Sequence, residues 1–520
     1  MAIRRFNFLT ALIVVALAAP GPALADGSSD KQIVHVLNRI AFGPTPADAA
    51  HVKQIGIDRY IDEQLHPDRI PEPPELTERL AVLDTLKLDP AQLFAQYGPI
   101  LPALNGGVKP TPEEAKARRR RAQIIVRQAQ AARIWRALYS RRQLQEVMVG
   151  FWYDHFNVFA GKGLDHLWAG NFEATAIRPY ALGHFRDLLL ATAHHPAMLF
   201  YLDNQLNTAP GSPGARGNLT GLNENYAREI MELHTLGVDG GYTQADVESL
   251  ARILTGWGLE RRNLRGGAGA AAGFDASRHD FTEKTFLGRT IAPTGEGEGT
   301  EAIGMLASSP ATAHHIAFEL AQYFVADKPP PGLVDRLAQR FRETDGDIAA
   351  VMKTLLASRE FRASAGQKYK TPYQYVLSAA RAAGVEIVNP RPLLGTMARL
   401  GEPLFYCQTP DGYKNTEDAW LSPDATTLRI GFATGLGRGV LPLNNPPPEE
   451  QIAANPPPAQ PQLVTDPPRA QAAKPVPLDP AQLEQLLAPV LSDNTRAIGA
   501  EARPDLKAAL ILGSPDFMRR

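Results

Sequence analysis

Two apolar stripes with helical spacing, separated by a glycine-rich turn, constrain the fold of this chain most strongly. The first stripe consists of Leu222, Tyr226, Ile230 and Leu233, which recur every three or four residues. Gly237 follows at a position that suits the left-handed residue ending a helix. A capping-box-like pattern from Thr243 to Asp246 then opens a second stripe that runs to Leu254, near Trp257. The pattern predicts a helical hairpin over residues 221–257.

Helical signals recur along the rest of the chain. Thr45 followed by Pro46 has the form of a helix start. The stretch from Arg118 to Tyr139 has no glycine or proline and predicts a long helix, and Pro196 opens a shorter one. A chain of 520 residues can bury one large core or two ordinary ones. We therefore expect a mainly α fold, either a single large multi-helical domain or two packed helical subdomains.

Two stretches interrupt the helical pattern. Residues 261–298 are rich in glycine and lack periodicity, which is more typical of a functional or disordered loop than of an overlooked element. Residues 446–480 hold 12 prolines in 35 positions and predict a flexible, polyproline-type insertion. We expect a helical domain over residues 26–445, the insertion, and C-terminal helices over residues 481–520 that pack back on the domain.

The first 25 residues have the three parts of a secretory signal. Arg4 and Arg5 precede an apolar run from Phe6 to Ala19, and Ala23-Leu-Ala25 forms a small-x-small cleavage site. The run is shorter than the roughly 20 residues that span a bilayer comfortably, and no later stretch is long and apolar enough to do so. We expect a signal peptide over residues 1–25, export by the general secretory or the twin-arginine route, and a periplasmic or extracellular mature chain without a transmembrane span.

Charge and cysteine content exclude further classes. The formal net charge of −1 provides no global field for nucleic acid, and the basic run from Arg118 to Arg121 lacks interleaved aromatic residues. That run is more typical of a solvated helix face. Cys407 is the single cysteine, so the fold cannot rely on an internal disulfide. Its apolar neighbours predict a buried side chain rather than a reactive thiol.

The polar face of the first hairpin helix carries the main functional candidates. Glu224, Arg228 and Glu232 have the spacing of a solvated ion-pair ladder. In the other interpretation, Glu229 lies at the edge of the apolar stripe and faces a cleft together with Glu232. Two close carboxylates there would split their pKa values or share a divalent cation. His234 is expected to point away from this edge, so the spacing does not match a Glu-x-x-His di-iron motif.

Other polar candidates lie outside this face. His279, Asp280 and Lys284 fall in the glycine-rich stretch, and loops on a rigid scaffold often carry function. The remaining candidates lie among aromatic residues or near helix starts, and they are His155, His195, Asn223 and Asn225. His155 is more often a satisfied core histidine in such a setting, and His195 can cap a neighbouring backbone. No nucleophile elbow, phosphate loop, dinucleotide fingerprint or zinc-spaced set of cysteines and histidines is present.

Several motifs along the chain resemble those of a known protein family. The matching stretches are His35 to Thr45, Phe151 to Phe156, Ile177 to Asp187, His195 to Leu199, Leu222 to Glu229, Glu232 to Val238, Leu254 to Trp257, His279 to Lys284, Pro410 to Tyr413 and Gly513 to Phe517. Together they resemble the domain-of-unknown-function 1800 family of bacterial, usually exported proteins, over nearly the whole mature chain. The proline-rich insertion and Cys407 depart from the family pattern.

The resemblance implies export and a helical fold but no catalytic residues, because the family has no established activity. It also implies a partner, an envelope protein of the domain-of-unknown-function 1501 family, whose members look like relatives of sulfatases and phosphatases. Two hypotheses follow. The first is an envelope enzyme with acid/base or metal-assisted chemistry and an unidentified cofactor, a divalent cation being one candidate. The second is a non-catalytic surface or assembly protein in which the polar motifs brace helices or bind a partner.

In the enzyme hypothesis the candidate residues converge on one cleft. The catalytic candidates are Glu229, Glu232, His279 and Asp280. The binding candidates are His155, His195, Asn223, Asn225, Arg228 and Lys284. The hypothesis therefore predicts that the polar edge of the 223–237 helix meets His279 and Asp280 in one pocket.

Overall fold

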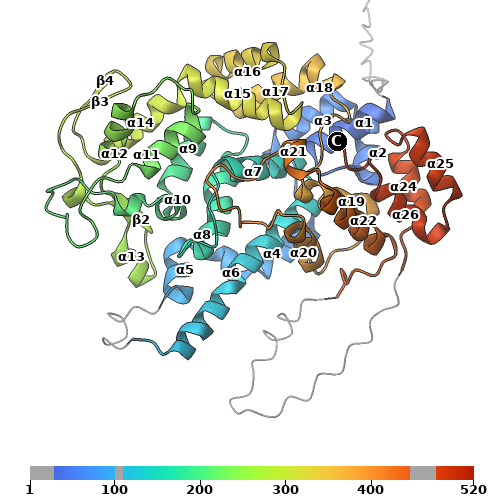
Figure 1. Cartoon of the computed structure of the whole chain (residues 1–520), viewed down its shortest axis with the longest axis horizontal. Helices are drawn as coiled ribbons and strands as arrows, with labels where there is room; N and C mark the ends of the chain where they lie inside the picture. Colours follow the sequence, from blue (N-terminus) through green and yellow to red (C-terminus); the bar gives the residue numbers. More distant parts are fainter. Residues whose placement is uncertain (1–28, 100–108, 446–475) are drawn as a thin grey trace, which may run out of the picture.

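A computed structural model of the chain describes residues 29–99, 109–445 and 476–520. The predicted signal peptide and most of the predicted proline-rich insertion lie outside the described residues. Helices dominate this part of the chain, and its four short strands form two separate ribbons (Figure 1). The predicted mainly α class is therefore confirmed. One contiguous set of buried apolar side chains extends from Ile33 to Met518, which is consistent with a single large multi-helical domain.

The elements fall into three stretches of the chain. The first holds α1 (Asp30–Ile40), α2 (Pro46–Ile55), α3 (Ile57–Gln64), η1 (Pro67–Arg69), α4 (Pro74–Ala81), η2 (Asp84–Lys87), α5 (Pro90–Tyr97), α6 (Pro112–Tyr139), α7 (Gln143–His155), α8 (Asp165–Phe172), η4 (Glu173–Ile177), η5 (Arg178–Tyr180), α9 (Phe185–His194), α10 (Pro196–Tyr201), η6 (Asn204–Leu206), α11 (Asn225–Glu229), η7 (Ile230–Thr235) and α12 (Gln244–Ile253). The glycine-rich stretch and the residues just before it hold β1 (Trp257–Leu259), α13 (Arg261–Gly266), β2 (Ala272–Phe274), η8 (Ala276–Arg278), β3 (Lys284–Phe286) and β4 (Arg289–Ile291). The last holds α14 (Glu296–Ala307), α15 (Pro310–Phe324), α16 (Pro331–Glu343), α17 (Ile348–Ala357), α18 (Arg359–Ala363), α19 (Pro372–Ala383), α20 (Arg391–Arg399), α21 (Glu417–Trp420), α22 (Pro423–Gly437), α24 (Pro480–Leu487), α25 (Asp493–Glu501) and α26 (Pro504–Leu512).

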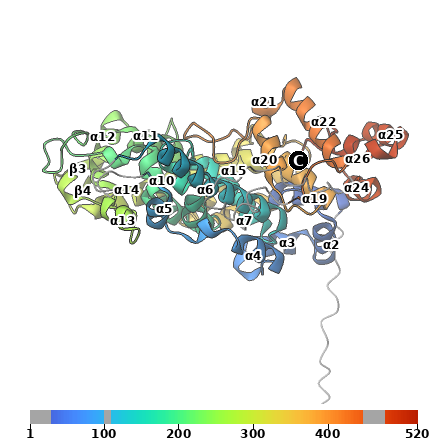
Figure 2. The same cartoon turned by 90° about the horizontal axis from the view of Figure 1, so that it is seen from below.

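The molecule is elongated. The hairpin, α14 and both ribbons occupy one end, and α24 to α26 occupy the other (Figures 1 and 2). Helix α7 lies between these ends, and most of its side chains are buried, Trp152 completely. The C-terminal helices return to the body, because α26 packs against α22. Arg520 then enters the core, where a guanidinium nitrogen donates to the carbonyl of Tyr323 at 2.8 Å.

The predicted hairpin is present, but its first helix is not regular. After one turn α11 passes into the π-helix η7, and Gly237 at φ 83° ends it. A π turn holds one residue more than an α turn. The buried position consequently passes from Leu233, as the stripe predicted, to His234, which is 2% exposed. Thr243 forms the predicted capping box at the start of α12.

The glycine-rich stretch corrects a prediction. Rather than lacking secondary structure, this stretch and the residues just before it contain two antiparallel ribbons, with β1 paired to β2 and β3 paired to β4. Each strand is three residues long, and glycines occupy the centre of the first ribbon, where Gly258 pairs with Gly273. Strands this short cannot display the alternation from which a strand is predicted.

Helix starts were predicted more accurately. Thr45 accepts a hydrogen bond from the backbone of Asp48 at 3.0 Å and precedes Pro46 at the start of α2. The long predicted helix is α6, and His195 caps α10 by accepting from the backbone N–H of Ala197. None of the helices in the described ranges combines the length and the apolar character that a bilayer-spanning segment needs.

Candidate functional site

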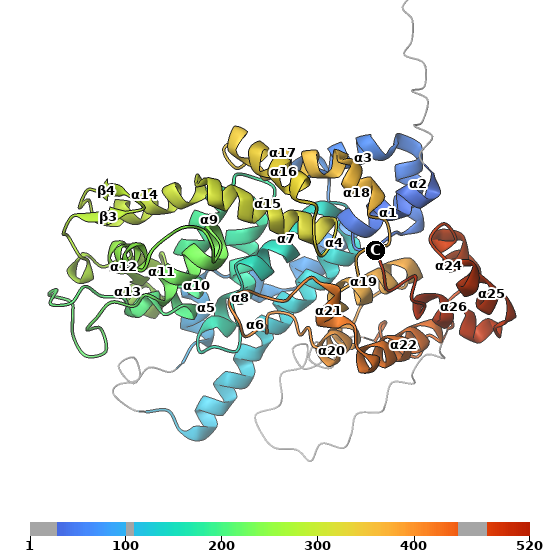
Figure 3. The same ribbon diagram turned by 45° about the horizontal axis from the view of Figure 1, so that its top comes forward.

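An irregular segment, residues 403–416, connects α20 to α21 and lies across α7 and α10 (Figures 1 and 3). The side-chain amide of Asn157, just after α7, donates to the carbonyl of Cys407 at 3.0 Å. The hydroxyl of Tyr201 in α10 donates to the carbonyl of Gln408 at 2.8 Å. Polar side chains from the body therefore satisfy the backbone of this segment where it has no secondary structure of its own.

The middle of the 403–416 segment touches α7 very closely. Gly412 adopts φ +62°, and a Cβ at this position would lie 2.1 Å from the backbone oxygen of Asp154. Glycine is therefore required here both by the backbone conformation and by the approach. Phe405 has φ 67° although it is bulky, a conformation that costs free energy and is concentrated at functional sites.

Glu229, at the junction of α11 and η7, lies near Asp411 of this segment. Its side chain is half-buried, and no described residue hydrogen-bonds its carboxyl group. Burial raises the pKa of Glu229, and the nearby carboxylates of Glu232 and Asp411 raise it further, whereas Arg228 lowers it. A half-buried carboxyl group with a raised pKa and no hydrogen-bond partner is a candidate acid/base group.

Arg228 is the centre of the predicted ladder. Its guanidinium lies 3.4 Å from Glu224 and 3.4 Å from Glu232, and it donates to the amide oxygen of Gln244 at 2.9 Å. These groups are solvent-accessible, so each pair contributes about 0.2–0.5 kcal/mol to helix stability. Glu232 also hydrogen-bonds Tyr242, whose pKa burial and this carboxylate raise to about 12. The ladder therefore engages Glu224, Arg228 and Glu232 but leaves Glu229 out.

His155 is the last residue of α7, and both of its ring nitrogens are engaged. Its Nδ1 lies 2.7 Å from a carboxylate oxygen of Glu319, and its Nε2 lies 3.2 Å from the backbone oxygen of His234. Burial alone would raise the pKa of Glu319, but His155 and the neighbouring His315 lower it. His155 therefore joins α7 to α15 and η7, and neither ring nitrogen is free to meet a substrate.

Two further carboxyl groups lie behind the 403–416 segment. Burial raises the pKa of Asp154 to about 7, against the opposing effects of Arg133 and the backbone of Tyr413. Burial raises the pKa of Glu402 to about 8, and the charge of Asp154 adds to this shift. The Glu402 carboxyl accepts a hydrogen bond from the backbone of Tyr373 at 2.6 Å. No sequence pattern singled out Glu402, which has no motif around it.

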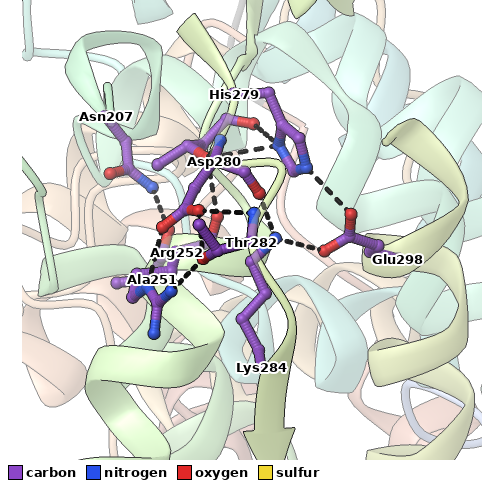
Figure 4. A network of polar contacts seen from close by, with 9 residues as sticks. Asn207, Ala251, Arg252, His279, Asp280, Thr282, Lys284 and Glu298 are labelled. Carbon is purple, nitrogen blue, oxygen red and sulfur yellow. Dashed lines mark hydrogen bonds and ion pairs between the residues drawn. The ribbon is translucent and has the colours of Figure 1, made fainter. Parts of the chain in front are cut away.

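His279 and Lys284 belong to a different, closed network in the glycine-rich region (Figure 4). The Nε2 of His279 lies 3.0 Å from one carboxylate oxygen of Glu298, and the Nζ of Lys284 lies 2.6 Å from the other. The Nδ1 of His279 lies 2.8 Å from the backbone oxygen of Thr255. The side chains of His279, Lys284 and Glu298 are fully buried.

Asp280 lies at the edge of this network. Burial raises its pKa, but the hydrogen bonds from Arg252 and Thr282 outweigh this and lower the value to about 2. The guanidinium of Arg252 donates to the Asp280 carboxylate at 2.7 Å. Asp280 is therefore ionised and paired at neutral pH, which suits a brace between α12 and the strand region better than a proton donor.

The remaining candidate side chains also make hydrogen bonds that stabilise the fold. The Nε2 atom of His195 lies 3.0 Å from the side-chain oxygen of Asn171, and burial lowers the pKa of His195 to about 3. The side-chain amide of Asn223 donates to the carbonyl of Asp203, and that of Asn225 to the carbonyl of Leu202, each at 3.2 Å. These contacts fix the turn before α11.

The candidates therefore fall into two groups rather than one pocket. Glu229 and Glu232 lie near Asp411 of the 403–416 segment, whereas His279 and Asp280 pack between α12 and α14. No described hydrogen bond or ion pair joins the two groups. Asp411 lies within the family motif from Pro410 to Tyr413, so this motif could have identified it as a candidate site residue.

Metal binding has no geometric support within the described ranges. No group of three or more histidine, cysteine, aspartate or glutamate side chains there is arranged to hold a metal ion. Cys407 is buried as predicted, and burial raises the pKa of its thiol. The thiolate form is therefore disfavoured, which opposes nucleophilic chemistry at this residue.

Comparison with known proteins adds one finding. The family model described as "Protein of unknown function (DUF1800)" matches residues 35–519. No curated protein and no solved structure matches the chain.

Proposed function

We propose, on the premise that this chain belongs to the DUF1800 family of proteins of unknown function, that it is an exported enzyme of the cell envelope. In this proposal Glu229 is the general acid/base group, and the 403–416 segment covers it. Export rests on the secretory signal in the first 25 residues.

One observation carries the enzymatic part of the proposal. Glu229 has a raised pKa, is half-buried and has no hydrogen-bond partner among the described residues, whereas the candidate side chains of His155 and His279 are engaged by backbone and carboxylate groups. A structural carboxylate inside a protein is normally paired or hydrogen-bonded. An unpaired one with partial solvent access is available to a ligand.

The neighbours of Glu229 suit proton transfer. A carboxyl group with a raised pKa can donate a proton to a leaving group and then take one from water. Glu232 and Asp411 supply the negative charge that favours its protonated form. Lys414 pairs with Asp411 at 2.5 Å and keeps that second carboxylate ionised. The arrangement fits hydrolysis of an ester or glycosidic bond.

We propose the acid/base form of the enzyme rather than the metal-assisted form. Glu229, Glu232 and Asp411 offer the oxygen ligands that hard cations prefer. The described side chains, however, do not converge in the number and geometry that a divalent cation needs. A partner of the domain-of-unknown-function 1501 family remains part of the proposal on the strength of the family resemblance alone.

A second candidate function is a non-catalytic surface or assembly protein. It is favoured by the number of motif side chains that brace the fold, among them His155, His195, Asn223 and His279. In this hypothesis the family motifs stabilise the fold that presents a binding surface. Glu229 then becomes a contact for a basic partner.

Turnover of chromogenic substrates distinguishes the two functions. The mature chain is assayed with p-nitrophenyl acetate, p-nitrophenyl glycosides and p-nitrophenyl phosphate. We expect turnover of one class and a loss of about 10²–10⁴-fold in Glu229→Gln, the usual contribution of a general acid/base group. Glu224→Gln, five residues earlier, is the matched control and keeps its activity. No turnover of any class, or equal turnover by both variants, overturns the enzyme proposal.

A further inference from the structure

A cleft lies beside the β1–β2 ribbon, and Glu229 is not among its lining residues. This cleft has a volume of about 460 Å³, within the range of small-molecule sites. Its walls come from η6, the ribbon, the first residues of α13 and η8. Gly258 and Gly273 form a strand pair that lines the cleft. The guanidinium of Arg278 fills the space over Gly258, whereas the space over Gly273 is bordered only by Glu260 at ordinary contact distances.

Three polar side chains at the cleft have unused hydrogen-bonding capacity. The side-chain amide of Gln205 and the guanidinium of Arg261 make no hydrogen bond or ion pair with any described residue. One carboxylate oxygen of Glu260 accepts from the backbone of Arg262 at 3.3 Å, and the other has no described donor. The cleft therefore offers an amide that both donates and accepts, a guanidinium that donates and a carboxylate that accepts.

The charges around the cleft balance. Arg261 and Arg278 face Glu260 and Asp275, two cations against two anions. Arg278 is also committed to the fold, since it donates to the carbonyl of Gln205 at 2.8 Å and lies 3.3 Å from Asp275. A charged ligand would gain attraction from one pair and repulsion from the other.

The cleft also has an apolar side, formed by Leu219, Leu259 and Phe274. A ligand that fits all these groups is uncharged, carries neighbouring hydroxyls that both donate and accept, and has an apolar face. Sugars combine these properties. We propose that this cleft binds a short neutral oligosaccharide through Gln205, Glu260 and Arg261. The site shares no residue with the Glu229 region, so it stands or fails independently of the proposed enzymatic function.

Calorimetric titration of the mature chain with neutral trisaccharides tests the proposal. The probes are chitotriose, cellotriose and maltotriose, with inorganic phosphate and uncharged trialanine as competing ligand classes. We expect saturable binding of at least one trisaccharide. In Arg261→Ala the affinity falls about tenfold, the size expected for one lost hydrogen bond from a charged donor. Arg262→Ala is the matched control, because this neighbouring residue does not line the cleft.

A second variant blocks the cleft without removing a polar group. A Cβ at Gly273 would meet Glu260 only at ordinary contact distances of 3.6 and 3.7 Å, so Gly273→Leu is compatible with the backbone. We expect it to abolish binding while the thermal unfolding midpoint stays near that of the wild type. The proposal is overturned if no trisaccharide binds at millimolar concentration, if phosphate or trialanine binds instead, or if Arg261→Ala and Gly273→Leu bind as the wild type does.

Discussion

The Nε2 atom of His279 lies 3.0 Å from a carboxylate oxygen of Glu298, and neither side chain is exposed to solvent. Lys284 approaches the other oxygen of the same carboxylate at 2.6 Å, from β3. Glu298 thus joins the strand region to α14, and it also accepts a hydrogen bond from the backbone of Gly295 at 3.0 Å. The family motif around His279 is explained by this connection without a catalytic role.

Replacing the central carboxylate is expected to destabilise the fold. Glu298→Ala leaves Lys284 buried without its counter-charge and His279 without its partner, a change that typically costs about 3–5 kcal/mol. The free energy of unfolding, measured by denaturant titration, is expected to fall by about this amount. Glu301→Ala, an exposed position on the same helix, is the control and leaves stability unchanged. A loss no greater than that of the control would show that the network contributes nothing.

The pair of Asp154 and Glu402 predicts a pH dependence of stability. Their pKa values of about 7 and about 8 lie above the usual values of about 4 for such groups in an unfolded chain. The folded protein therefore binds more protons between about pH 4 and pH 8, and the free energy of unfolding falls as pH rises through this window. The stabilising contribution is fully present at the acidic end and lost above about pH 8.

Amide substitutions isolate this effect from other titrating groups. Asp154→Asn and Glu402→Gln mimic the protonated forms, so their unfolding midpoints relative to wild type should rise as pH increases from 5 to 9. Thermal unfolding at fixed ionic strength across this range measures the difference. A difference that is constant with pH, or that falls, contradicts raised pKa values at both positions.

The contact of Gly412 with α7 is expected to hold the 403–416 segment in place. In Gly412→Ala the new methyl group overlaps the backbone oxygen of Asp154, and the residue must also keep φ +62°. Gly288→Ala serves as the control, because it has φ +73° and open space around its Cβ position. The control carries only the backbone penalty of about 1–2 kcal/mol.

Hydrogen exchange measures how Gly412→Ala and Gly288→Ala differ in their effect on the 403–416 segment. The amides of residues 403–416 should exchange faster in Gly412→Ala than in the wild type, with a loss of stability greater than that of Gly288→Ala. The same exchange in both glycine variants would mean that the close approach to Asp154 does not position the segment.

Local helix chemistry could be predicted from the sequence. Thr45, Thr243 and His195 act through atoms two or three residues away, so their roles as caps follow from the local pattern. The burial of Cys407 followed in the same way from its apolar neighbours. The hairpin was predicted as a whole, but the π turn after Glu229 was not, because it gives no distinctive residue pattern.

Contacts between distant segments could not be predicted. The sequence motifs predict that Glu229 meets His279, because both are polar residues in motifs. The structure instead brings Glu229 near Asp411, since an irregular segment without periodicity crosses α7 and α10. The short β1–β2 ribbon was missed for a related reason, as its central glycines carry no apolar pattern. The raised pKa of Glu402 and the buried contacts of Glu298 also depend on elements far away in the sequence, so no local pattern predicts them.

Titration of Glu229 tests the central claim most directly. Glutamate labelled with ¹³C at the carboxyl carbon is followed by NMR from pH 3 to pH 9, and the Glu229 signal is assigned by its loss in Glu229→Gln. We expect a pKa above about 4.3, the usual value for glutamate, and a lower pKa in Asp411→Asn, which removes one of the charges that raise it. A Glu229 pKa at or below the usual value, unchanged in Asp411→Asn, would contradict the proposed acid/base site.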